Sequence, residues 1–232
     1  WWLGTESEGQ AKDDISAGLG LTVEQLDSVV AKSTTLSVQI ATLVQAADTA
    51  IPSTSAGGVQ SVQDRALMVT ASVVKQVESA WVDMVEAGGS PSLSNPELIE
   101  TILVETVIDS SAEITTWIET RIESGEIDES SLDAETLAAV IDLKNESEVI
   151  AQTGLSGEAL AQVTAVASTT TAVNGQISLA IARGGVEVLA DTATAEALSG
   201  LVGDTLNEAA DLIAGVINIE VFLENTNVAE IV

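Results

Sequence analysis

Carboxylates are the side chains that this sequence gathers most densely, so carboxylate chemistry is the first to consider. The region from Glu119 to Glu135 is rich in Asp and Glu around Gly125. Two such carboxylates could hydrolyse a glycosidic bond if they faced each other across a groove, usually between aromatic walls that hold the sugar. Aromatic residues make up only 2% of the chain. We therefore do not expect a glycoside hydrolase.

The same region has some features of a calcium-binding loop. From 123 to 129, the sequence Glu-Ser-Gly-Glu-Ile-Asp-Glu places oxygen ligands on both sides of a glycine, but it lacks the spacing of an EF-hand. The candidate ligands are Glu123, Glu126, Asp128 and Glu129. We weigh two interpretations, a weak calcium site and a solvated loop between helices. Calorimetry that shows no binding at millimolar calcium would remove the first.

Most other kinds of active site are excluded by composition. The chain has no His and no Cys, so it cannot build a Ser-His-Asp triad, a cysteine nucleophile or a His or Cys metal site. It has no Walker loop, and its Gly-Gly pairs at 57–58, 88–89 and 184–185 fall where helices should end. The net charge of −29 repels nucleic acid and anionic lipid. We expect a protein that is not an enzyme and that binds neither a cofactor nor nucleic acid.

The elements that carry these residues are predicted to be long helices, because apolar residues recur at spacings of three and four. Hydrophobic residues make up 46% of the chain, enough for a sizeable core. The first seam, within 21–51, consists of Leu26, Val29, Ser33, Leu36, Ile40, Leu43, Ala47 and Ala50. A second helix, 59–87, carries along one side Val59, Val62, Ala66, Val69, Val73, Val77, Trp81 and Met84.

Further helices are predicted at 95–125, 133–151 and 156–182, then beyond 186 and at 204–217. Alternating apolar residues at 219–224 predict a short C-terminal strand. The predicted fold is an all-α bundle of long antiparallel helices, formed by residues 21–232, with residues 1–20 as an N-terminal arm.

A recurring motif marks several of these helix starts. The form Leu-cap-x-Glu-x-Leu occurs at 21–26, 132–137 and 155–160, and a weaker copy lies at 193–198. The Thr, Asp or Ser at the second position should cap free amides, and the Glu meets the positive end of the helix dipole. Good helix starts could arise independently, or the chain could hold a degenerate duplication of 21–131 and 132–232.

One of these starts carries a family resemblance. The stretch 154–164, Gly-Leu-Ser-Gly-Glu-Ala-Leu-Ala-Gln-Val-Thr, resembles helical segments of very large secreted bacterial surface proteins of the adhesin and calcium-binding repeat type. The resemblance covers two short stretches of the chain. It implies a bacterial cell-surface or extracellular location, which the Cys-free, Lys-poor composition rich in Thr, Ser, Ala and Val also suggests. The glycine-aspartate nonapeptides that bind calcium in such proteins are absent, so calcium binding does not follow from it.

A charge-free stretch is the other unusual feature. Residues 159–182 contain no ionisable side chain, so a helix there should be buried on all sides. It could be the core helix of this fold, a surface for assembly with another molecule, or a segment that inserts into membranes. For assembly, the candidate interface residues are Trp1, Trp2, Val163, Val166, Val173 and Ile177.

The ends and apolar runs of the chain complete these expectations. The chain begins Trp-Trp-Leu-Gly, without an initiator Met or a basic region, so we interpret it as a mature or excised fragment. No run of about 18 apolar residues occurs, which predicts no conventional membrane span.

We expect a structural or assembly protein of a cell surface or extracellular structure whose partner is a protein, either another copy or part of a larger assembly. A membrane-active helical protein and an accessory subunit of a complex are the alternatives.

Overall fold

The computed structural model describes residues 13–15, 17–52, 62–86, 88, 92–93, 95–185 and 192–226. In this part of the chain, all regular structure is helical and the helices pack as a bundle, which confirms the predicted fold class. After short helical turns at 13–15 and 17–19, the elements are α2 (Val23–Ala50), α3 (Val62–Glu86), α4 (Pro96–Glu123), α5 (Ala134–Thr153), α6 (Gly157–Gly184), α7 (Thr192–Ile213) and α8 (Ile219–Asn225).

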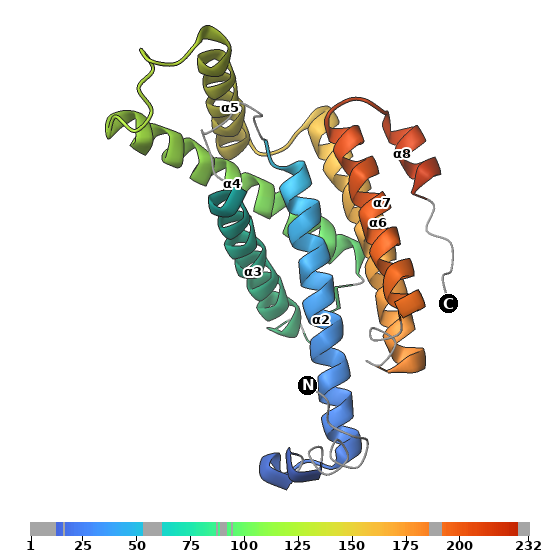
Figure 1. The fold of residues 1–232 in the computed structure, drawn as a ribbon. Helices are drawn as coiled ribbons and strands as arrows, with labels where there is room; N and C mark the ends of the chain where they lie inside the picture. Colours follow the sequence, from blue (N-terminus) through green and yellow to red (C-terminus); the bar gives the residue numbers. More distant parts are fainter. Residues whose placement is uncertain are drawn as a thin grey trace.

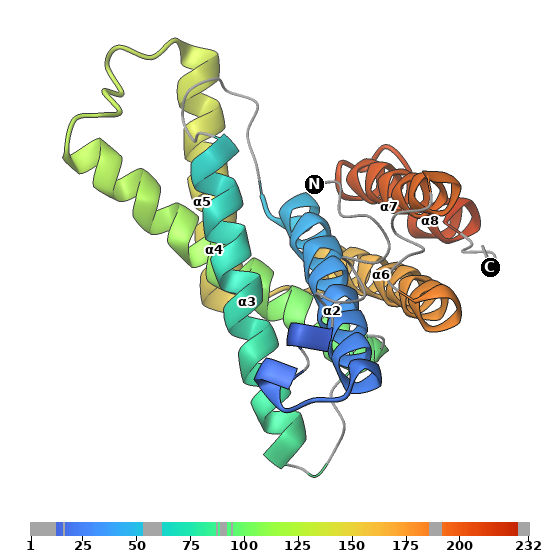
Figure 2. The same ribbon diagram turned by 60° about the horizontal axis from the view of Figure 1, so that its bottom comes forward.

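The helices form two groups with α2 between them (Figures 1 and 2). One group is α3, α4 and α5, and the other is α6, α7 and α8. Helix α4 runs obliquely across the bundle and contacts α2 and α6 as well as its own group, so it joins the two. No helix in the described ranges has the length and apolar character needed to cross a lipid bilayer.

Small aliphatic side chains fill the core, as the composition predicts. A large cluster draws on α2 to α8 and includes Leu43, Val73, Ile102, Ile114 and Phe222, each at most 1% exposed. A smaller cluster lies between α6 and α7, around Val173 and Ile177. Both halves of the predicted duplication contribute to the large cluster, and the duplication itself stays a prediction.

The predicted caps form at most of the helix starts. Thr22 and Gln25 make a capping box, with the Gln25 amide donating to the Thr22 hydroxyl over 3.2 Å. Asp133 caps α5, and Asn95 caps α4 directly before Pro96. Ser156 is the exception, because its side chain makes no capping hydrogen bond and Gly157 enters α6 with a φ of 57°. The weaker copy at 193–198 lies inside the first turns of α7.

The predicted C-terminal strand is wrong, because residues 219–225 form helix α8. The Asn218 side chain accepts a hydrogen bond from the Val221 amide and starts a helical turn. Phe222 is fully buried against α6 and α7, whereas Val221 and Leu223 are 37% and 48% exposed. The residue that packs this helix against the bundle is therefore Phe222, and not the alternating apolar residues that predicted a strand.

The predicted seam of α2 is buried at Leu26 and along the C-terminal half of the helix, but not between them. Leu43, Ala47 and Ala50 lie in the core, but Val29 is 53% exposed and Ser33 is also exposed. Figure 1 shows the reason, because the N-terminal half of α2 extends beyond the helices that cover the rest of it.

Candidate functional site

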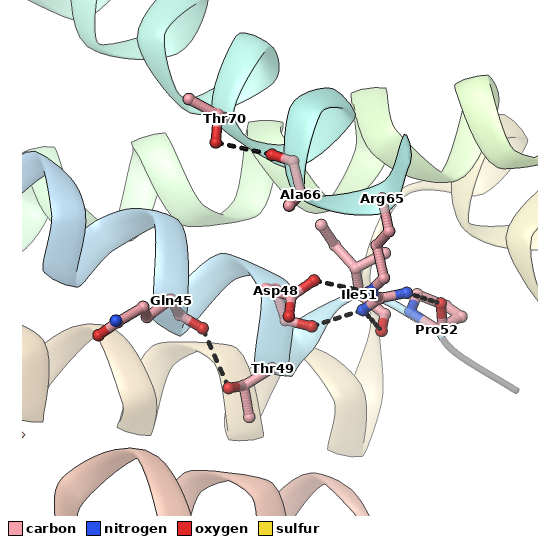
Figure 3. Close-up of polar contacts among 8 residues, drawn as sticks. All are labelled: Gln45, Asp48, Thr49, Ile51, Pro52, Arg65, Ala66 and Thr70. Carbon is pink, nitrogen blue, oxygen red and sulfur yellow. Dashed lines mark hydrogen bonds and ion pairs between the residues drawn. The ribbon is translucent and has the colours of Figure 1, made fainter. Parts of the chain in front are cut away.

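Arg65, near the start of α3, binds the C-terminal end of α2 (Figure 3). Its Nε donates to Asp48 Oδ1 over 2.6 Å, and its Nη2 donates to the carbonyls of Asp48 and Ile51 over 2.6 and 3.0 Å. Its Nη1 donates to the Pro52 carbonyl over 2.9 Å. The last carbonyls of a helix have no partner within the helix, so one guanidinium fork supplies donors that α2 itself cannot. Arg65 thereby joins α3 to α2.

Beside this arginine lies a cavity of about 540 Å³. Its walls come from the ends of α2, α5 and α7, the start of α6, and Arg65 of α3. Ile150, Leu155 and Ile213 are half-buried and give it apolar walls. The polar lining includes Gln162, whose side-chain nitrogen donates to the Leu212 carbonyl over 3.0 Å. The cavity has the size and the mixed lining of a small-molecule site.

Two of the four candidate calcium ligands, Glu126 and Asp128, bind neighbouring residues of the protein. Glu126 pairs with Arg121 over 3.0 Å, and the Arg121 guanidinium lies 4.4 Å from the Trp117 ring centre. Asp128 accepts hydrogen bonds from the Ser130 hydroxyl, over 2.6 Å, and the Ser130 amide. These two bonds, the hydroxyl first, lower the pKa of the Asp128 carboxyl below its ordinary value.

The remaining loop candidates, Glu123 and Glu129, are exposed. Among the described residues, which include this whole loop, no three carboxylates are placed to hold a metal ion together. Glu123, Glu126, Asp128 and Glu129 are therefore not gathered as a calcium site requires, and the geometry is that of a solvated loop between α4 and α5.

The predicted interface residues of α6 lie inside the protein. Val163 and Val166 are 2% and 1% exposed, and Val173 and Ile177 are fully buried. Helix α6 therefore occupies the core position, the first of the three alternatives for the charge-free stretch. Trp1 and Trp2 lie outside the described residues.

A buried polar network, which the sequence did not reveal, holds α6 in place. The Gln39 side chain of α2 donates to the Asn174 carbonyl over 3.2 Å and to the Ser178 hydroxyl over 2.9 Å. The Asn174 side chain donates to the Leu93 carbonyl over 2.9 Å. One sequence feature could have indicated this network. Gln39 and Asn174 are amide side chains within charge-free stretches, and buried amides need hydrogen-bond partners.

The outer face of α3 exposes several large apolar residues. As predicted, Val69, Val73 and Val77 are buried, whereas Ala66 of the same predicted side is exposed and Trp81 and Met84 are half-buried. The opposite side exposes four large apolar residues: Leu67 (66%), Val74 (47%), Val82 (48%) and Val85 (53%). Among the described helices, α3 contacts only α2 and α4. We call this surface the α3 face.

No protein-family model, curated protein or solved structure matches the chain. The resemblance of 154–164 to helices of bacterial surface proteins therefore rests on those residues alone.

Proposed function

We propose that this protein is a non-enzymatic structural or assembly protein that works through helix–helix contacts, in a cell-surface or extracellular structure. The observation that supports this best is the α3 face. Several large apolar residues exposed on one face of a helix indicate an interaction site more strongly than exposed residues scattered singly over the surface. The absence of His and Cys and the engagement of the loop carboxylates in local bonds support a non-catalytic role.

The residue spacing on the α3 face suits a second helix. Positions 67, 71, 74, 78, 81 and 85 are separated by alternating steps of four and three, the pattern of a coiled-coil seam. Trp81 lies half-buried within this seam, and tryptophan is enriched among the residues that contribute most to binding. Glu78 is exposed in the middle of the seam, where a charged group opposes close packing.

Another copy of the chain is the partner that we propose first. Two copies each carrying −29 repel one another, so assembly should depend on salt that screens this charge. Light scattering at low and physiological ionic strength should show association that increases with salt. A monomer under both conditions would contradict self-assembly.

Matched charge insertions test whether the α3 face is responsible. Val74→Glu places a carboxylate on the α3 face, and Val149→Glu places one on an exposed valine of α5. We expect the first variant to remain monomeric at physiological ionic strength and the second to associate like the unmodified protein. Equal association of both variants would show that assembly uses another surface.

Removing the charge in the seam should have the opposite effect. Glu78→Gln should strengthen self-association roughly tenfold, because it replaces the central carboxylate by an uncharged side chain of similar shape. The control is Glu86→Gln, which removes an equal charge from an exposed position outside the seam of 67–85. Sedimentation equilibrium measures both dissociation constants.

An accessory subunit bound to a different protein is the second candidate, and the same α3 face favours it. This candidate predicts a monomer that assembles only when its partner is supplied. If the protein is monomeric at every salt concentration, and Val74→Glu abolishes capture of a defined partner while Val149→Glu does not, this second function replaces the first.

A further inference from the structure

The cavity beside Arg65 lies where three helices end. Ala50 and Ile51 line it from the end of α2, Ile150 from the last turn of α5, and Ile213 from the end of α7. Figure 1 shows the ends of α2 and α7 at the same end of the molecule. Each helix C-terminus carries a partial negative charge of about half an electron. None of these three helices has a basic residue in its last turn.

Two helices bring their positive ends towards the cavity: α6, and α3, whose first turn carries the acidic Asp64 beside Arg65. The start of α6 contributes Leu155 and Ala159 to the lining, and Glu158 lies in its first turn. That carboxylate offsets the positive end of the α6 dipole. The backbone around the cavity therefore contributes net negative potential.

The charged side chains of the lining act in the same direction. They are Asp48, Arg65 and Glu146. Arg65 directs its donors to Asp48 and to the end of α2, so its charge is compensated where it lies. Glu146 makes no ion pair or side-chain hydrogen bond with any described residue, and it is exposed at the cavity. One carboxylate thus faces the cavity without a cation.

We propose that this cavity binds a small organic cation with an apolar body, such as an alkylammonium ion. Glu146 and the helix ends attract the ammonium group, and the walls formed by Ile150, Leu155 and Ile213 take up the alkyl chain. A bare metal ion fits less well, because the described residues place no three carboxylates together. The site is separate from the α3 face and does not depend on the proposed assembly.

Titration calorimetry with three probes tests the chemistry of the ligand. The probes are n-octylammonium, which has both head and chain, methylammonium, which has the head alone, and n-octanoate, which has the same chain with the opposite charge. At physiological ionic strength, we expect n-octylammonium to bind a single site, at least roughly tenfold more tightly than methylammonium. Octanoate binding that equals or exceeds octylammonium binding would overturn the proposal.

Two pairs of variants test the location, since cations also associate loosely with any strongly acidic protein. Ala210→Trp fills the cavity from α7, and its control Ala197→Trp adds the same bulk at an exposed alanine of α7 outside the lining. Glu146→Gln removes the cavity carboxylate, and Asp142→Asn removes one from the exposed side of α5. Circular dichroism confirms that each variant is folded.

We expect octylammonium binding to be lost in Ala210→Trp, weakened roughly tenfold in Glu146→Gln, and unchanged in both controls. Binding that survives Ala210→Trp, or that falls equally in Glu146→Gln and Asp142→Asn, would show general attraction to the acidic surface and would overturn the site.

Discussion

Basic residues are scarce in this chain, 7 against 36 acidic ones, and the structure uses several of them to connect helices. Among the described residues, four such connections are Arg65–Asp48, Lys75–Asp109, Arg121–Asp64 and Lys144–Glu119. Exposed ion pairs usually contribute about 0–1 kcal/mol. Arg65 differs from the others because its side chain is only 15% exposed and also holds backbone carbonyls. It should therefore matter more than its charge alone.

Arg65→Gln should lower the free energy of unfolding by about 1.5–3 kcal/mol, because the carbonyls at the end of α2 lose charge-assisted hydrogen bonds in a partly buried position. Urea denaturation measures the change. Lys32→Gln removes the same charge from an exposed position and should change stability much less. If both variants lose equal stability, the effect is one of net charge and the geometry of the arginine fork is unimportant.

Asp133 makes the start of α5 sensitive to acid. Its carboxylate accepts hydrogen bonds from the Thr136 amide, over 2.8 Å, the Thr136 hydroxyl and the Glu135 amide. Chiefly through the Thr136 bonds, the pKa of the Asp133 carboxyl is lowered in the folded protein. The stabilisation is therefore complete above the ordinary pKa of an aspartate and is lost as the pH falls below about 4.

Asp133→Asn keeps a capping oxygen but does not titrate, so its melting temperature should fall less steeply below about pH 4 than that of the unmodified protein. Asp133→Ala should be less stable by a few degrees at neutral pH. Thermal melts from pH 3 to pH 7 measure both effects. Identical pH profiles for Asp133→Asn and the unmodified protein would show that this carboxylate is not coupled to folding.

At the scale of helices, the sequence predicted where most of the helices lie. Apolar residues spaced three and four apart indicate them, and capping residues and glycines mark their ends. Thr22 and Asp133 cap as expected, whereas Ser156 makes no capping hydrogen bond. The sequence could not predict how far neighbouring helices reach, which is why Val29 belongs to the predicted seam yet is 53% exposed. A period-two pattern of six residues was also too short to distinguish a strand from α8, where burial of Phe222 decides the outcome.

The candidate site was less predictable than the fold. Arg65 is separated from its acceptors Asp48, Ile51 and Pro52 by a connection between helices, and no local motif announces that pairing.

The charge-free stretch correctly indicated a helix in the core, but α6 is not buried on all sides, because Leu179 is 41% exposed and Ser168 and Ala172 are also exposed. Composition alone could not distinguish burial within one chain from burial between chains. That distinction depends on which helices surround α6, which is a tertiary property.

Helix α8 is held to the bundle mainly by one side chain. Among the described helices it contacts α6 and α7 alone, and Phe222 is its buried residue. Removing a buried phenylalanine costs about 3–5 kcal/mol when the surrounding helix stays in place. A seven-residue helix near the end of the described chain can instead detach, which limits the global loss.

Phe222→Ala should therefore raise amide hydrogen exchange selectively in 219–225, while exchange in α4 remains slow. Leu223→Ala, at a neighbouring 48% exposed position of the same helix, should leave that exchange nearly unchanged. Exchange that increases throughout the bundle in Phe222→Ala would show that α8 is an integral part of the core.

At the scale of the whole molecule, the net charge of −29 is the dominant electrostatic feature. Repulsion among like charges opposes the compact state, and the few ion pairs between helices offset only part of it. Salt weakens both effects, with a screening length of about 8 Å at physiological ionic strength. Because carboxylates far outnumber basic groups, screening should remove more repulsion than attraction.

We therefore expect the melting temperature to rise as sodium chloride is increased from low to physiological concentration. The increase should be largest at the lowest ionic strengths, where screening changes most steeply. Salt-induced association would also raise the melting temperature, but that contribution depends on protein concentration. Melts at two protein concentrations, repeated with the Val74→Glu variant, separate the two. A melting temperature that falls with salt would mean that the four ion pairs contribute more to stability than the surplus of carboxylates costs.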